Sequence, residues 1–283
     1  MNFKQPLSPA KEAPKENLVR VAYSTDHFIQ SIKNATNNPA DLIVKLLPSK
    51  LMLIYIDKLV DNQTLNKDII GNLQNKPHET PDTIEATLSI PEVVISSLLK
   101  ETIESIVNGS VVIHVDGFPQ VLLANIANRE SRALAAPENE SQVIGAQGGF
   151  NESLSTNISV IRRYIMSPDL CNEKLKIGTR TNTSVSLLYM HGIANDQMVN
   201  TLRQRITDLN FDELLDSAVL SEMIDDNSLS VLPQMLLTER PDRFCDALLD
   251  GKVGVIVDGS SVFGKWSTKK LICSASLQMS LLP

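Results

Sequence analysis

Two stretches of this chain occur twice in the same order, and this repetition constrains its fold more than any other feature. An apolar run with a central tyrosine, Leu53–Ile56, recurs as Leu187–Met190 at an offset of 189 − 55 = 134 residues. A glycine, a short apolar run and an Asp-Gly pair, Gly109–Gly117, recur as Gly251–Gly259 at an offset of 259 − 117 = 142 residues. Glycine ends helices, apolar runs form buried strands and Asp-Gly favours tight turns. The sequence therefore predicts two similar α/β modules in tandem. The alternative is coincidence, since a strand followed by Asp-Gly is common.

Each module should alternate helices and strands, which is typical of an α/β fold in which mixed sheets are flanked by helices. In the first module we expect helices near Thr25–Thr36 and Thr64–Leu73, a strand at Leu51–Ile56, a long helix from Pro91 to Val107 and a strand at Val111–Val115. In the second we expect helices at Asn151–Ile165, at Met198–Leu209 and from Pro241 to Gly251, with strands at Val185–Met190 and Val253–Val257. The two prolines suit a first helical turn, where the missing N–H costs nothing.

These elements and the local composition set the expected boundaries. A disordered tail covers residues 1–17, the first module 18–127, a hinge connector 128–149, the second module 150–259 and a divergent C-terminal segment 260–283. The connector holds Gly145, Gly148 and Gly149, which supply backbone freedom, so a flexible hinge is the default interpretation. Arg132 and Glu140 within it are equally consistent with plain solvated charges.

An amphipathic helix follows the connector. Its apolar positions are Phe150, Leu154, Ile158, Ile161 and Ile165. At about 100° per residue these five fall within roughly 80° of one another. Arg163 lies on the opposite face, and Asn157 and Arg162 lie near the edges of the apolar stripe. One face should therefore pack while the other presents a cation. The alternative is an ordinary surface helix with a solvated back.

The chain from the connector into this helix follows the pattern Arg…Pro-x-x-Glu…Gly…Gly-Phe-x-Glu-x-x-x-x-Asn-x-x-x-Ile-Arg-Arg. The positions that carry it are Arg132, Pro137, Glu140, Gly145, Gly149, Phe150, Glu152, Asn157, Ile161, Arg162 and Arg163. A second pattern, L-P-Q…T-E-R-P-D…L-L-D-G-K-V-G-V-I-V-D-G, runs from Leu232 to Gly259. Together the two motifs resemble the signature of the A subunit of spore germinant receptors, in its large N-terminal soluble region. The resemblance covers roughly residues 20 to 260.

The resemblance implies a non-enzymatic role in sensing the nutrients that break spore dormancy. In that family the A subunit works with a membrane-spanning B subunit and a lipid-anchored C subunit in the inner membrane of the spore. This region would then be soluble on the cytoplasmic (spore core) side, and the full-length protein would reach the membrane through parts absent from this chain. The germinant would be an amino acid, a sugar, a nucleoside or an ion.

The sequence departs from the family pattern in two places. Ile144 and Gln147 flank the loop glycines where the family commonly has basic residues, so charge pairing through that loop is not carried over. After Gly259 the family continues through a segment with aspartate and tyrosine into membrane helices, whereas residues 260–283 do not follow that pattern.

Composition argues against several other functions. The net charge of −7 disfavours general nucleic-acid binding, which needs clustered Lys and Arg. Cys171, Cys245 and Cys273 are far apart and odd in number, which favours reduced thiols over a disulfide framework or a metal pair. Phosphate loops, nucleophile elbows and metal-binding histidine spacings do not occur, so we expect no cofactor and no metal. Without a run of about 18 apolar residues, the chain is not expected to span a bilayer.

Two modules on a hinge suit closure around a small molecule, or a pivot that passes a signal to the membrane part. The candidate binding or interface residues are Arg132, Glu140, Asn157, Arg162, Arg163, Arg240 and Asp242. We expect the last three arginines to lie near the contact between modules or with partner subunits. For Arg240, an intramolecular salt bridge is as good an expectation as a contact between the modules. A scaffold that binds no ligand is the second hypothesis. An enzyme of small-molecule metabolism is the third, disfavoured by the lack of any nucleophile–base spacing.

Overall fold

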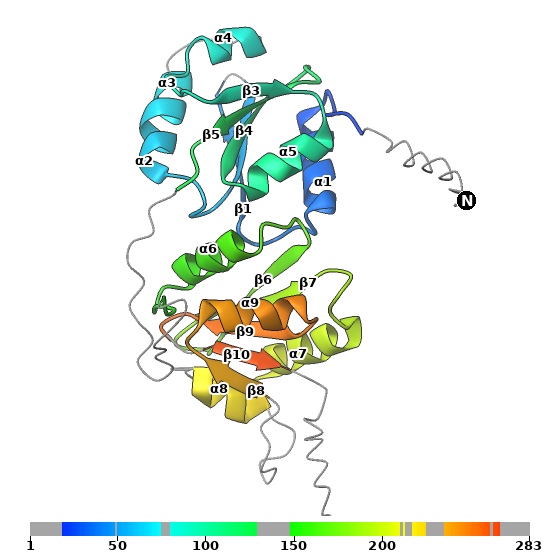
Figure 1. Ribbon diagram of the computed structural model, residues 1–283, viewed down its shortest axis with the longest axis vertical. Helices are drawn as coiled ribbons and strands as arrows, with labels where there is room; N and C mark the ends of the chain where they lie inside the picture. Colours follow the sequence, from blue (N-terminus) through cyan, green and yellow to red (C-terminus); the bar gives the residue numbers. More distant parts are fainter. Residues whose placement is uncertain are drawn as a thin grey trace, which may run out of the picture.

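The computed structural model describes residues 19–48, 50–74, 80–128, 148–209, 212, 217–224, 235–260 and 263–266. Within these ranges the chain forms two modules, one above the other in Figure 1. The first contains α1 (Thr25–Ala35), β1 (Leu42–Leu47), β2 (Leu51–Ile56), α2 (Asn62–Thr64), the π-helix η1 (Leu65–Ile70), α3 (Gly71–Gln74), α4 (Pro81–Glu85), β3 (Val93–Ser96), α5 (Leu99–Val107), β4 (Ser110–Val115) and β5 (Val121–Asn125). The second contains α6 (Leu154–Tyr164), β6 (Leu170–Ile177), β7 (Thr183–Met190), α7 (Asp196–Asp208), α8 (Ser217–Ile224), β8 (Met235–Thr238), α9 (Pro241–Leu249), β9 (Val253–Val257) and β10 (Phe263–Trp266).

The two five-stranded sheets have the same topology. Their strand orders are β1-β2-β4-β5-β3 and β6-β7-β9-β10-β8, so every strand of one sheet has a counterpart in the other. The register repeats as well, because Leu53 lies opposite Ile113 in the first sheet and Leu187 lies opposite Val255 in the second. These pairs differ by 187 − 53 = 134 and 255 − 113 = 142 residues, the two offsets of the repeated sequences. The prediction of two similar tandem modules is confirmed.

The sheets are antiparallel in all their described pairings, where mixed sheets were expected. In the first module α5 joins β3 to β4, and these two strands run in the same direction. However, β5 lies between them and pairs antiparallel with both. In the second module α9 joins β8 to β9 around β10 in the same way. A sequence in which strands and helices alternate indicates a helical connection between two strands that run in the same direction. It does not show that a further strand lies between them, and the expectation of mixed sheets was wrong for this reason.

The long helix predicted over Pro91–Val107 is wrong in its first half. Val93–Ser96 form the edge strand β3, which pairs with β5, and α5 begins only after it. Three consecutive β-branched residues favour this strand over a helix. Ser96 then makes the turn into α5, since its Oγ accepts from the N–H of Leu98 at 3.1 Å and donates to Glu101 at 2.5 Å.

Helices cover both faces of each sheet, which explains why the central strands read as unbroken apolar runs. Every residue of β2 and of β4 is buried. On one face of the first sheet Leu53 and Ile113 pack against η1, α3 and α4, and on the other Met52 and Ile54 pack against α1 and α5. In the second module α7 and α8 cover one face, and α6 and α9 cover the other. Each module thus has three layers and its own two core regions.

The repeated Asp-Gly turns hold the first helix of each module. Asp116 Oδ1 accepts the N–H of Thr25 at 3.2 Å, and Asp258 Oδ1 accepts the N–H of Leu154 at 3.1 Å. The glycine after each aspartate has a positive φ and donates its N–H to a carbonyl two residues before the helix. A carboxylate at the positive end of a helix is favourable, so these aspartates act as helix anchors.

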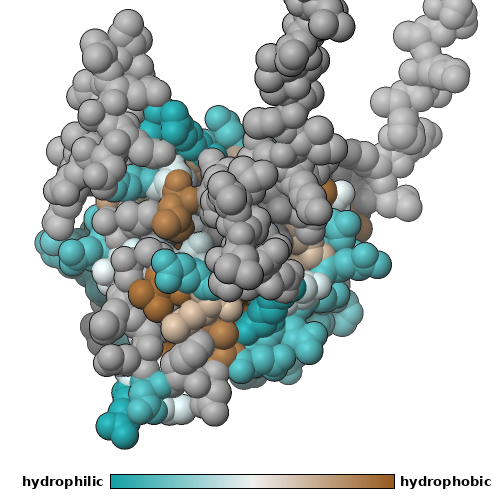
Figure 2. Space-filling model, turned by 90° about the horizontal axis from the view of Figure 1, so that it is seen from below, coloured by the Kyte–Doolittle hydropathy of each residue, from teal (hydrophilic) through white to brown (hydrophobic). Residues whose placement is uncertain are grey.

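The end of the second module that is remote from the first exposes aliphatic side chains. Val219 and Met223 on α8 and Leu237 on β8 are exposed. Figure 2, which views this end, shows apolar side chains interspersed with hydrophilic ones. None of the helices in the described ranges combines the length and the apolarity that a membrane span requires.

Candidate functional site

Helix α6 forms the side of the second module that faces the first (Figure 1) and brings the Arg-Arg pair of the sequence motif to their junction. Ser153 caps its start, and the Asn157 side chain bonds both the N–H and the carbonyl of Asn151, at 2.9 and 2.5 Å. The five positions of the apolar stripe are buried, but so are Asn157, Ser159 and Arg162. The alternative of a surface helix with a solvated back is therefore wrong, because the first module covers that back.

A buried ion pair joins the modules. Arg162 Nε lies 2.8 Å from Asp41 Oδ2, and Nη2 lies 3.0 Å from Oδ1. The two side chains are only 2% and 7% exposed, so this bidentate pair is shielded from water. Asp41 immediately precedes β1, and its neighbour Ala40 donates its N–H to the carbonyl of Asn172 on β6 at 2.8 Å. The start of β1 and the edge strand β6 are thus bound to each other across the junction.

A cavity of about 230 Å³ lies beside this ion pair, and we call it the polar cavity. Its walls come from both modules and include Ala40, Asp41, Asp57, Ile158, Asn172, Lys174, Ser184, Ser186 and Asp258. Asn172 Oδ1 and Ser186 Oγ are buried without a hydrogen-bond partner among the described residues. Their residues are 3% and 1% exposed. Buried polar groups nearly always have a partner, so two exceptions on one cavity wall point to a water or a ligand there.

The chemistry of the polar cavity suits recognition of a small polar molecule. Asp57, Asp258 and Lys174 bring charges of both signs to its wall, and the serines bring hydroxyl groups. Asp258 already accepts the N–H of Leu154, and Asp41 is paired with Arg162. The volume lies below the range of about 300–1,000 Å³ that is usual for ligand sites, so the occupant would be small.

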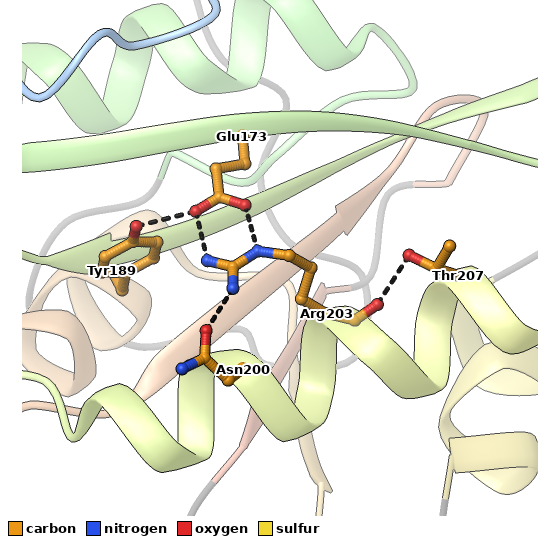
Figure 3. A network of polar contacts seen from close by, with 5 residues as sticks. All are labelled: Glu173, Tyr189, Asn200, Arg203 and Thr207. Carbon is orange, nitrogen blue, oxygen red and sulfur yellow. Dashed lines mark hydrogen bonds and ion pairs between the residues drawn. The ribbon is translucent and has the colours of Figure 1, made fainter.

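The opposite side of β6 carries a polar network, drawn in Figure 3. Glu173 accepts hydrogen bonds from Nε and Nη2 of Arg203, both at 2.6 Å, and from the hydroxyl of Tyr189 at 2.7 Å. Arg203 also donates to Asn200. Burial alone would raise the pKa of Glu173, but the hydrogen bonds from Arg203 and Tyr189 outweigh it and hold that pKa below its ordinary value. Burial, and then the bond to this carboxylate, raises the pKa of Tyr189.

This network fixes the strand that forms the wall of the polar cavity. Successive side chains of a strand point to opposite faces, so Glu173 faces α7 while its neighbours Asn172 and Lys174 face the cavity. The network therefore ties β6 and β7 to α7 without occupying the cavity.

The structure separates the three predicted arginines. Arg162 makes the ion pair between modules, and Arg163 next to it is partly buried, with its Nε lacking a hydrogen-bond partner among the described residues. Arg240 instead lies at the start of α9 and pairs with Asp242 of the same helix, with Nε 3.0 Å from Oδ1. The sequence left open whether Arg240 forms an intramolecular salt bridge or a contact between modules. The structure shows the intramolecular salt bridge. A partner contact at Arg240 and Asp242 stays a prediction.

The predicted hinge is described only at its end. Gly148 and Gly149 precede α6, and the next residue, Phe150, donates its N–H to the carbonyl of Glu239 at 2.9 Å. Arg132, Glu140 and Gly145 lie outside the described residues, so their roles stay predictions.

Sequence reasoning missed Asp41, Asn172 and Ser186, which form the centre of the junction. Asp41 carries no local signal, since its partner lies 121 residues away in the chain. Asn172 and Ser186 carry no clear signal either, because the face of β6 that holds Asn172 continues with Lys174 and Lys176, and the face of β7 that holds Ser186 also holds Ser184. Alternation along these strands therefore does not separate residues that line the polar cavity from residues that face solvent.

The remaining candidates for reactive groups are metal-binding clusters and cysteine thiols. No group of three or more His, Cys, Asp or Glu residues there is placed to hold a metal ion. Cys171 and Cys245 are buried free thiols, and burial raises the pKa of both. A buried thiol with a raised pKa is a poor nucleophile. Cys273 lies outside the described residues.

The chain is similar to proteins of spore germination. A family model described as Bacillus/Clostridium GerA spore germination protein matches residues 30–263. Spore germination protein KA of Bacillus subtilis is 32% identical over 258 residues, which cover 87% of this chain and 47% of that protein. Spore germination protein GerQA of Bacillus cereus is 30% identical, with coverages of 87% and 47%. The chain thus spans about half the length of the curated relatives it matches.

A solved structure shares the fold. It is the crystal structure of the N-terminal domain of the A subunit of the Bacillus megaterium spore germinant receptor GerK3, with a TM-score of 0.69 and 26% sequence identity. The match covers 88% of this chain and 96% of the solved one. The arrangement of two sheets flanked by helices is therefore common to both.

Proposed function

Because this chain belongs to the Bacillus/Clostridium GerA spore germination protein family, we propose that it senses a small germinant molecule and transmits that event to the rest of a spore germinant receptor. The observation that carries the proposal is the polar cavity between the modules. Asn172 Oδ1 and Ser186 Oγ are buried there without a partner among the described residues, which is costly unless something binds them. A germinant that supplies those hydrogen bonds would favour the arrangement of modules in which the cavity is closed.

Transmission would pass through α6. This helix lines the polar cavity with Leu154, Ser155 and Ile158, and one turn further on it carries Arg162 of the ion pair. A ligand shifts an equilibrium only by its differential affinity for the two states. Since the cavity wall combines residues of both modules, a ligand bound there distinguishes a closed junction from an open one.

The remaining elements of the proposal come from the family. We propose that the whole protein is an A subunit that assembles with B and C subunits, and that this region lies on the spore-core side of the inner membrane. We further propose that it acts without catalysis, since sensing needs only binding and a change of conformation.

A scaffold that binds no germinant is the second candidate. The observation that favours it is the strength of the junction, where a bidentate buried ion pair and the Ala40–Asn172 backbone bond both join the modules. Such a junction would hold the receptor together even if the polar cavity contained only water.

Thermal unfolding of the 283-residue chain with millimolar amino acids, glucose, inosine or KCl, each added alone, separates the two candidates. A compound that binds only the native state at about 100 times its dissociation constant adds roughly 2.7 kcal/mol, a shift of a few degrees. We expect Ser186→Ala to remove that shift without lowering the free energy of unfolding of the ligand-free chain, because its hydroxyl has no hydrogen-bond partner among the described residues to lose.

Ser159→Ala is the matched control. Its hydroxyl is equally buried on α6, donates to the carbonyl of Thr156 at 2.7 Å and does not line the polar cavity. It should keep the ligand response. Flat curves for the folded wild-type chain across the whole panel would favour the scaffold.

A further inference from the structure

Arg163 differs from its neighbour Arg162 in having no counter-charge among the described residues. Arg162 is neutralised by Asp41, whereas no described residue forms an ion pair or a side-chain hydrogen bond with the Arg163 guanidinium. Its Nε is fully buried, so water does not replace the missing partner at that atom. Burial removes part of the hydration of the Arg163 guanidinium, and no described protein group replaces the lost interactions with water.

Arg163 lines a second cavity of about 520 Å³, which we call the Arg163 pocket. The pocket lies between α6 and the ends of α5 and β5, and its apolar lining comes from Leu59, Val107, Ala127 and Met166. Asn108, Asn125 and Asn128 also line it. None of the described lining residues is acidic. The Arg163 pocket therefore combines one end that attracts an anion with walls that favour hydrocarbon.

The local charge balance is positive even though the pocket lies at the C-terminal end of α6. Arg162 and Arg163 both line it, and together they bring two positive charges. Asp41 cancels one of these, and the carbonyl end of the helix contributes roughly half a negative charge. About half a positive charge remains, which favours an anion over a cation or a neutral molecule.

We propose that the Arg163 pocket binds a small carboxylate anion with a short aliphatic chain. The carboxylate accepts hydrogen bonds from the Arg163 guanidinium, whose planar fork matches its two oxygens. The aliphatic chain lies against Val107, Ala127 and Met166. The proposal does not depend on germinant binding, because this site and the polar cavity have different linings.

The ion pair between modules separates the two sites. Asp41 lines the polar cavity and Arg162 lines the Arg163 pocket, so the pair is the wall between them. A carboxylate bound to Arg163 lies next to Arg162 and competes with Asp41 for that guanidinium. Binding in the Arg163 pocket therefore weakens the junction, which makes the pocket a site of regulation.

The test is a titration of the 283-residue chain with sodium butyrate, followed by the amide signals of Val107, Ala127 and Met166 in two-dimensional NMR. Sodium chloride at the same ionic strength and butan-1-ol are the matched probes that lack the carboxylate. We expect saturable shifts with butyrate only. Arg163→Gln should weaken butyrate binding by about tenfold or more, the loss expected for a charge-assisted contact. Arg180→Gln, at a guanidinium that is 81% exposed, should leave it unchanged.

A butyrate response equal to that of chloride or butan-1-ol would overturn the proposal, and so would unchanged affinity in Arg163→Gln. If Arg163→Gln fails to fold, Arg163→Lys replaces it, because lysine keeps the charge and loses the fork, and binding as tight as that of wild type would again contradict the proposal. If Ser186→Ala abolishes the butyrate response and Arg163→Gln does not, the carboxylate binds in the polar cavity. That result would refute the proposed site at Arg163 and leave the proposed function intact.

Discussion

Replacing Arg162 with methionine is expected to lower the free energy of unfolding by about 3–5 kcal/mol, because it leaves Asp41 buried without a counter-charge. The Asp41 side chain is only 7% exposed, so water cannot take over the role of the guanidinium. Urea denaturation followed by circular dichroism measures the loss. Since the ion pair joins the two modules, the variant should also unfold in two steps rather than one, with each module behaving separately.

Two further variants make this prediction specific. Arg162→Met combined with Asp41→Leu should recover most of the lost stability, because replacing both members of a buried pair by apolar residues is often neutral. Arg203→Met breaks an ion pair that is about one-third exposed, and screening by solvent should limit its cost to about 1 kcal/mol. An Arg162→Met protein within about 1 kcal/mol of wild type would show that the buried pair does not hold the junction.

Gly254→Val in β9 should cost about 3 kcal/mol, the upper end for overpacking of a core. A Cβ atom at position 254 would lie 2.2 Å from Cζ of Phe244 on α9. That ring is fully buried and packs edge-on against Phe150, with ring centroids 5.7 Å apart, so it has little room to move. Thermal unfolding monitored by calorimetry would measure the loss.

The first module shows which residues can replace Gly254 and Phe244 in the same strand–helix contact. At the offset of 142, the counterparts of Gly254 and Phe244 are Val112 and Thr102, both buried, so a larger strand residue there accompanies a smaller helix residue. We therefore expect Gly254→Val with Phe244→Thr to lose less stability than the sum of the two single changes, by about 1–3 kcal/mol. Gly71→Ala is the milder comparison, because that glycine has an ordinary helical φ of −59° and an added Cβ would lie 3.3 Å from the carbonyl oxygen of Asn66, so its cost should be well below that of Gly254→Val. Strict additivity of the double variant would contradict the explanation.

The repeated motifs made the tandem architecture predictable. The runs around Tyr55 and Tyr189 and the two Asp-Gly turns are local patterns, and each formed the element that its pattern indicates. The edge strands were harder to find. Pro91 suits the start of a helix, and this predicted a helix where β3 lies. The β-branched residues of β3 instead form their backbone hydrogen bonds with β5. Pairing with a distant strand overrode the local signal.

The junction could be predicted only in part. The motif pointed to Arg162 and Arg163 as interface residues, but helical periodicity placed Arg163 on the solvated face and Arg162 at the edge of the stripe. Which arginine pairs is decided by Asp41, a residue of the other module that no local pattern identifies. The polar cavity was likewise out of reach, since it exists only where β6, α6 and the start of β1 meet.

Amide hydrogen exchange at Ala40 tests most directly the claim that a small molecule in the polar cavity is felt at the junction. Its N–H donates to Asn172 across the two modules at 2.8 Å and therefore reports on the junction itself. With the panel of amino acids, glucose, inosine and KCl, we predict that at least one compound changes the exchange rate of Ala40 by about tenfold, the effect of a change in opening free energy of about 1.4 kcal/mol. Ile113, in the core of the first sheet, should be unaffected. An exchange rate at Ala40 that no compound alters in the folded chain would contradict the account.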